Sequence, residues 1–429
     1  MLSIIFLLFS KILCFEIIRL NFEQNTTLPK SKEPNDIMNY LQYNNIYTEF
    51  IVGTPEKKVK ARIFFDCYNL ALPGENSIGD IQKLSESSST LKFNSKETSK
   101  FFSTFFKSGK KAKETFKLNS LNNGRIKYDS INFIYTNELK EDYPGVLGLH
   151  IHEDAFADNL KEYNFIKTLK SLDIIESYFF TVKYNGKNKG EILIGNPPDK
   201  YDKRYKKEKF VYSKARSPLL GDDWGFNFNN IYLGDENLIQ KYEHGGVYFK
   251  LEYGVIHCPL DYQYYFNIIF KNYIDKGICF YVSKNNFTSY YYCKESIKKG
   301  FPTLTFELKS LKYNFTFTFD DLFEKVNGNY YFMVVFRKSE NTWKLGKQFF
   351  QKYQLVFNQD AKQIGVYTEI ESSFEIARFL IVIVSIIIVI LGFIIFTKYR
   401  KIPKIKKAKE LTEEDFNFDS EKNAQKLLG

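Results

Sequence analysis

Two acidic residues, Asp66 and Glu252, stand at matching places in the two halves of the chain. Each lies seven residues before a proline, Pro73 or Pro259, with an apolar segment between them. A carboxylate on a loop held by a rigid sheet is a frequent arrangement for a catalytic acid or base. Two such loops that meet across a pseudo-twofold axis would form a paired-carboxylate site.

Apolar segments separated by turn signals predict strands in both halves of the chain. Those of the first half lie at 47–52, 59–65, 115–118, 125–135, 179–184 and 191–195, and those of the second half between 224 and 367. We also expect a surface loop at 85–114, helices at 165–172 and 262–273, and a polar linker at 199–214. Two similar strand-rich halves indicate an all-β fold with two lobes and an internal repeat.

The balance of charge and the histidines exclude some classes of function. The net charge is +11, but the lysines are scattered and no recognised nucleic-acid module is present, so we expect no nucleic-acid partner. His244 and His257 do not have the spacing of metal ligands. We therefore expect neither a metal ion nor a cofactor.

The two ends of the chain carry targeting signals. Residues 1–15 are mostly apolar and too short to span a bilayer, which predicts a signal peptide. Residues 379–396 are apolar except for Ser385 and Gly392, and they would span about 27 Å as a helix. A lysine-rich segment follows. The sequence thus predicts one transmembrane helix at 379–397 and a cytoplasmic tail at 398–429. We expect a type I membrane protein of the secretory or endosomal pathway or of the cell surface.

An oxidising compartment favours disulfides and glycosylation. Cys279 and Cys293 close a short loop, and we expect them to pair. Cys67 and Cys258 lie in the two acid-bearing loops, where they are either an interlobe disulfide or two unrelated cysteines. Acceptor sequons for glycosylation begin at Asn25, Asn286 and Asn314.

An ordered series of segments resembles the pepsin-like aspartic peptidase family over residues 44–368. The matching segments are Ile51–Pro55, Tyr143–Leu149, Gly190–Gly195, Phe301–Phe306, Asp321–Phe323, Trp343–Tyr353 and Phe357–Gly365. The resemblance implies an all-β bilobal fold with an N-terminal lobe at 44–200 and a C-terminal lobe at 201–368. It also makes 16–43 an N-terminal arm or short pro-segment. The loop between Cys279 and Cys293 resembles the disulfide of the family's C-terminal lobe, and a monomer is expected.

The chain departs from the family at its catalytic motifs. The family uses two aspartates, each in an Asp-Thr/Ser-Gly turn, which share one proton and hold a water. Here the turn after Asp66 is two residues shorter and lacks glycine. When the second motif is aligned on Pro259 with the family's usual spacing, Lys250 takes the place of the second aspartate. If this motif has lost two residues, as the first has, Glu252 takes that place. The segment Phe105–Gly109 occupies the place of the family's flap tyrosine.

These departures predict impaired catalysis. A lysine opposite Asp66 would form an ion pair, and a glutamate would move its carboxylate by about 1 Å, which can lower a rate by ~10²-fold. We therefore expect a membrane-anchored pseudoprotease that binds a peptide or protein ligand in its interlobe cleft. The alternative is an active membrane-anchored aspartic endopeptidase that uses Asp66 and Glu252. A weaker third hypothesis is a structural surface glycoprotein.

Overall fold

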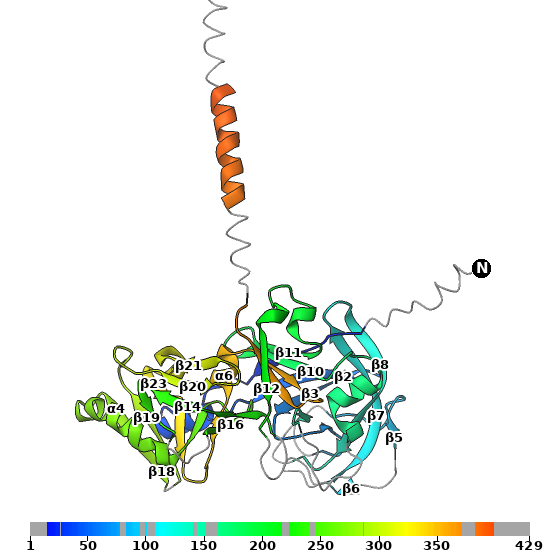
Figure 1. Cartoon of the computed structure of the whole chain (residues 1–429). Coiled ribbons are helices and arrows are strands. Elements are labelled where there is room, and N and C mark those ends of the chain that lie inside the picture. Colours follow the sequence, from blue (N-terminus) through cyan, green and yellow to red (C-terminus); the bar gives the residue numbers. More distant parts are fainter. Residues whose placement is uncertain are drawn as a thin grey trace, which may run out of the picture. The chain divides into compact units, whose positions relative to one another are not determined.

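The computed structural model describes most of the chain up to residue 370 and one helix beyond it (Figure 1). The described residues are 15–25, 27–77, 83–94, 99–100, 108–139, 144–151, 161–216, 223–239, 245–285, 287–370 and 382–398. Residues 1–369 and 370–429 are two separate units. Nearly all of the predicted signal peptide and cytoplasmic tail lie outside the described residues.

A large sheet runs through the first half of the chain and takes up strands from the second half. Its path, within the described residues, is β12 (Phe210–Lys214), β27 (Gln363–Tyr367), β26 (Leu355–Asn358), β10 (Phe179–Tyr184), β11 (Lys189–Gly195), β1 (Ile18–Gln24), β2 (Ile46–Val52), β3 (Lys57–Phe64), β9 (Val146–Gly148), β4 (Leu70–Pro73), β8 (Gly124–Thr136), β7 (Ser108–Ser120) and β5 (Lys92–Phe93), with β6 (Ser99–Lys100) beside β7. The sheet therefore crosses the predicted lobe boundary at residue 200. It also includes part of the predicted arm and of the predicted linker as strands β1 and β12.

The second half forms two further sheets. The larger one contains β13 (Gly225–Phe228), β16 (Gly245–Phe249), β25 (Trp343–Leu345), β17 (Ile256–Pro259), β24 (Val334–Arg337), β19 (Thr288–Cys293), β23 (Asn329–Phe332) and β22 (Phe323–Val326), with β18 (Cys279–Asn285) beside β19. The smaller one contains β15 (Glu236–Asn237), β14 (Asn230–Leu233), β20 (Leu304–Leu308) and β21 (Tyr313–Phe317). The α-helices in the described part of residues 1–369 are α2 (Pro34–Leu41), α3 (Phe165–Ser171), α4 (Gln263–Asp275), α5 (Phe319–Leu322) and α6 (Lys347–Lys352). Helices α3 and α4 confirm the two predicted helices.

The strand pairings around the two acid-bearing loops repeat. β3 leads into the Asp66 loop and then into β4, which runs parallel to β8 and antiparallel to β9. In the second half β16 leads into the Glu252 loop and then into β17, which runs parallel to β24 and antiparallel to β25. The alignment on the two prolines places Leu70 opposite Ile256, and these residues begin β4 and β17. The structure thus confirms the internal repeat.

Aromatic packing fixes the Asp66 loop against β10 and against two residues of the second half of the chain. The ring of Phe65 lies edge-on to those of Phe180, Phe350 and Phe357, with centroids 6.0, 5.4 and 5.3 Å away. Such pairs contribute about 0.5–1.5 kcal/mol each beyond the burial of their area. Because Phe65 directly precedes Asp66, its fixed position limits where the Asp66 carboxylate can lie.

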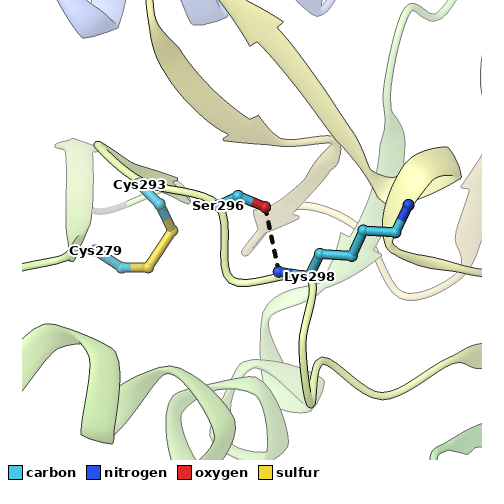
Figure 2. Close-up of a disulfide and its surroundings, with 4 residues drawn as sticks. All are labelled: Cys279, Cys293, Ser296 and Lys298. Carbon is cyan, nitrogen blue, oxygen red and sulfur yellow. Dashed lines mark hydrogen bonds between the residues drawn. A yellow bond between two sulfur atoms is a disulfide. The ribbon is translucent and has the colours of Figure 1, made fainter.

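One disulfide joins two neighbouring strands of the second half (Figure 2). Cys279 and Cys293 lie opposite each other in β18 and β19, and both are buried, which confirms the predicted pair. The Lys298 backbone N–H donates to Ser296 Oγ at 3.4 Å in the turn that follows. A disulfide that closes a loop of about 15 residues stabilises a fold by about 3 kcal/mol in the chain-entropy description.

Cys67 and Cys258 do not form a disulfide with each other. Cys67 packs in a small apolar cluster with Phe64 and Tyr163, while Cys258 is buried in the main core. The interlobe disulfide that the sequence left open is therefore not formed, because the two thiols belong to separate hydrophobic clusters. The sequon residues Asn25 and Asn314 are exposed, and Asn286 lies outside the described residues.

The C-terminal unit contributes one described helix, at 382–398. Among the residues that the structure describes, no helix has both the length and the apolar character that a membrane crossing requires. The predicted span at 379–397 begins three residues before this helix.

Candidate functional site

Asp66 stands in the loop between β3 and β4, and its side chain is 39% exposed. The loop is anchored to the end of β9 and to the residues after it: the Gly148 N–H donates to Asn69 O at 2.9 Å, and the His150 N–H donates to Cys67 O at 2.8 Å. A Cβ atom on Gly148 would collide with the carbonyl of Cys67. Glycine is required here because the two backbone segments approach so closely.

Glu252 lies in the equivalent loop of the second half, and it is buried. Its Oε2 accepts a hydrogen bond from the Phe65 N–H at 3.2 Å, so this carboxyl contacts the backbone next to Asp66. The Glu252 carbonyl accepts from the Asn44 N–H at 2.9 Å. Gly346 approaches this loop as Gly148 approaches the first, since a Cβ atom on it would collide with the carbonyl of Tyr253.

Lys250 also reaches Asp66. Its ammonium group forms an ion pair and a hydrogen bond with Asp66 Oδ1, and its Nζ lies 3.3 Å from Asp223 Oδ2. The Lys250 side chain is only 7% exposed. The two alignments of the sequence placed either Lys250 or Glu252 opposite Asp66. The structure brings both side chains to it.

The charges around Asp66 favour its ionised form. Burial alone would raise the pKa of Asp66, but the attraction of the Lys250 ammonium and its hydrogen bond hold that pKa below its usual range. Burial would likewise lower the pKa of Lys250, but Asp66, Asp223 and Glu252 raise it above its usual value. At neutral pH the pair is therefore an ammonium and a carboxylate. A carboxylate with a lowered pKa is a weaker base toward water.

Glu252 has the opposite behaviour. Burial and the negative charge of Asp66 raise the pKa of Glu252 to about 8, although Lys250 opposes this rise. Glu252 therefore keeps its proton at neutral and acidic pH. The two carboxyl groups hold one proton between them, as like charges at close range require.

Two residues of the site were not identified from the sequence. Asp223 contacts Lys250, and its Oδ1 lies 3.5 Å from His150 Nε2. His150 follows the apolar turn at 143–149, and Asp223 directly precedes Trp224, whose indole N–H donates to Leu149 O at 2.6 Å. The signal that could have found them is their position beside motifs that match the family.

The other candidate residues of the sequence lie away from the chemistry or outside the described residues. His257 is buried and its ring stacks on that of Tyr253 at 4.2 Å. Burial holds the pKa of His257 well below its usual value, so it is neutral. His244 and most of the expected flap segment, Phe105–Lys107, lie outside the described residues.

Comparisons with known proteins fit this architecture. The sequence model of a family described as eukaryotic aspartyl protease matches residues 82–368. This range begins after Asp66 and includes Glu252. No curated protein matches the chain.

Two solved structures share the fold. The basic 7S globulin from soybean has a TM-score of 0.61 and 13% identity, over 84% of this chain and 97% of that chain. Conglutin gamma, a basic 7S globulin from lupine seeds, has a TM-score of 0.59 and 14% identity, over 83% of this chain and 95% of that chain. The family model matches most of the chain and the acid-bearing loops repeat, so this chain belongs to the eukaryotic aspartyl protease family.

Proposed function

We propose that this protein is a pepsin-like pseudoprotease that no longer hydrolyses peptides and binds a peptide or protein ligand at the surface around Asp66. The observation that carries the proposal is the ion pair between Lys250 and Asp66. Peptide hydrolysis in the family needs a water held between two carboxyl groups, one of which removes its proton. Here a buried ammonium group occupies one oxygen of Asp66 and lowers its basicity.

Ligand binding is the part of the family's activity that does not need the water. Asp66 is partly exposed, so a bound chain could reach it from solvent. The loops that carry Asp66 and Glu252 are fixed by the backbone contacts of Gly148 and Gly346. A rigid surface of this kind binds a ligand at a lower entropic cost than a mobile one.

A second candidate function is hydrolysis by Asp66 and Glu252. The observation that favours it is the place of Glu252, whose Oε2 accepts from the Phe65 N–H beside Asp66 and which keeps its proton while Asp66 is ionised. In this arrangement Asp66 would be the base toward water and Glu252 the acid toward the peptide carbonyl. Lys250 would first have to leave Asp66.

A cleavage assay on a denatured protein substrate at acidic pH separates these candidates. We expect no turnover by the unaltered protein, with an active pepsin-like protease as the positive control. Asp66→Asn tests the site, and Asp320→Asn, at an exposed position, is the matched control. Turnover that Asp66→Asn abolishes and Asp320→Asn leaves intact would sink the pseudoprotease proposal and support the second candidate.

A binding assay tests the ligand. The unaltered protein, immobilised at neutral pH, should retain a reproducible subset of a random peptide pool. Retention should change with Asp66→Asn, because that substitution removes the carboxylate that the ligand would meet beside Lys250. Equal and unselective retention by both proteins would count against binding at this surface.

We further propose that residues 379–397 anchor the protein in a membrane of the secretory or endosomal pathway or at the cell surface, with the tail in the cytosol. The support is the apolar run at 379–396 and the lysines that follow it. In the described helix at 382–398, large apolar side chains from Val382 to Phe396 are exposed. Exposed apolar side chains on every face suit lipid better than water.

Membrane anchoring makes a direct prediction. The full chain, expressed in cells that recognise its signal peptide, should stay with the membrane pellet after alkaline carbonate extraction. A variant that ends at residue 378 should be released into the medium. Recovery of the full chain in the carbonate supernatant would contradict the anchor.

A further inference from the structure

A cavity of 450 Å³ lies away from Asp66, between the N-terminal segment and the second half of the chain. Its walls come from β1, α2, the turn between β10 and β11, α5, β22 and α6. Gly254, two residues after Glu252, also lines it. The volume lies within the range of about 300–1,000 Å³ that small-molecule sites occupy.

The amine of Lys347 is the polar centre of this cavity, which we call the Lys347 cavity. Its Nζ donates to Gln24 Oε1 at 2.5 Å and to Asn188 Oδ1 at 3.1 Å. Both acceptors are neutral amide oxygens. A lysine ammonium has three N–H donors, so a third remains for another acceptor.

The carboxylates that line the cavity are already matched with other lysines. Within the described residues, ion pairs join Asp320 to Lys298, Asp321 to Lys352, and Glu324 to Lys187. No described carboxylate forms an ion pair with Lys347. Lys325, which also lines the cavity, lies over the ring of Tyr330 at 5.2 Å. The cavity therefore holds more positive than negative charge.

Burial makes the charged form of Lys347 unfavourable unless an anion lies beside it. Burial lowers the pKa of Lys347 to about 8; attraction to Glu324 raises it, and repulsion from Lys187 lowers it further. The phenol of Tyr40, which also lines the cavity, has a pKa raised by burial and by Glu324, so it stays neutral where Lys347 titrates. A bound carboxylate would restore the charge balance around the amine.

The wall beside the charged groups is apolar. It is formed by Leu28, Leu41, Phe323, Val326 and Met333. Apolar walls with one or a few placed polar groups are the usual composition of a small-molecule site, in which the polar groups set the orientation of the ligand.

We propose that the Lys347 cavity binds a small amphipathic carboxylate, with the acid group on the Lys347 ammonium and the hydrocarbon part against the apolar wall. Such a ligand supplies the anion that the cavity lacks. It also covers apolar surface that water now contacts. Because the Lys347 backbone N–H donates to Tyr253 O at 2.8 Å, the cavity shares a wall with the loop that carries Glu252.

Octanoate, titrated calorimetrically into the full chain at neutral pH, is the probe. We expect saturable binding at one site. Lys347→Met keeps the length of the side chain and removes the charge, so the affinity should fall by about tenfold or more. Lys276→Met, at an exposed position of the second half, should leave it unchanged. The affinity of the unaltered protein should also fall at about pH 9.5, where the amine is largely neutral.

A second measurement uses the unaltered protein in case Lys347→Met does not fold. Octanoate should protect Lys347 from acetylation by acetic anhydride, read by peptide mass mapping, and should not protect Lys276. Octanol, which has the chain without the charge, should protect much less. Equal acetylation of Lys347 with and without octanoate, or equal affinity of Lys347→Met and the unaltered protein, would overturn the proposal.

Discussion

Glu252→Gln should abolish most of the loss of stability that the unaltered protein shows as the pH rises from about 4.5 to 8. The folded protein raises the pKa of Glu252 from its ordinary value near 4.5 to about 8, chiefly through burial. Between these values the folded state keeps a proton that the unfolded state releases, so stability falls as the pH rises. Each unit of pKa difference corresponds to about 1.4 kcal/mol of stability, and we expect a total loss of about 2–5 kcal/mol over this pH range.

Urea unfolding of the two proteins at a series of pH values measures this difference. Gln is neutral at every pH, so the variant should match the unaltered protein near pH 4.5 and exceed it near pH 8. Glu208→Gln, at an exposed position, should follow the unaltered protein at all pH values. A Glu252→Gln effect that is constant across this range would show that the Glu252 carboxyl does not keep its proton on folding.

The directions of the two pKa shifts also bear on the pH at which the protein works. Asp66 has a lowered pKa, so its contribution to stability is present at neutral pH and is lost only when strong acid protonates it. Glu252 contributes the opposite slope. Together they leave the site most stable in mildly acidic solution, which suits the proposed endosomal part of the secretory pathway.

Much of the fold could be predicted because its signals are local. The predicted bounds of β2, β3, β10, β11 and α3 agree with the structure to within a few residues. The start of α3 has a local signal, since its N-cap Asn164 accepts from the Lys167 N–H. The repeat could be predicted because Pro73 and Pro259 both end a buried four-residue strand.

Other elements depended on contacts that are distant in the sequence. The arm at 16–43 looked polar, yet β1 lies between β11 and β2 and forms hydrogen bonds with both. The sequence of the arm does not reveal these two partners. The linker at 199–214 looked equally polar, but β12 pairs with β27 at the far end of the chain. In both cases pairing with strands that are distant in the sequence outweighed local propensity.

The site could be predicted only in outline. The positions of Asp66 and Glu252 follow from the motifs, but the alignment could not decide between Lys250 and Glu252, because a shortened turn can bring either side chain forward. Asp223 could not be foreseen, since its role arises from the ion pair it makes with Lys250 in space.

A double-mutant cycle on Lys250 and Asp66 should give a coupling energy of about 1–2 kcal/mol at neutral pH. Lys250 is nearly buried, so removing its partner leaves a poorly solvated charge, and the loss of one member of a buried pair can cost about 3–5 kcal/mol. Asp66 is 39% exposed and Asp223 remains beside the ammonium, so the expected value is lower. The proteins to compare are the unaltered chain, Lys250→Met, Asp66→Asn and the double variant.

The pair of Lys298 and Asp320 provides the matched control, because both side chains are more than half exposed. Its cycle should give about 0–0.5 kcal/mol, as exposed pairs usually do. The coupling between Lys250 and Asp66 should also vanish in strong acid, where Asp66 takes up a proton. Equal coupling in the two cycles would mean that solvent screens the site as fully as the surface. Lys250 would then be a weak barrier to a water on Asp66, and the case for hydrolysis by Asp66 and Glu252 would strengthen.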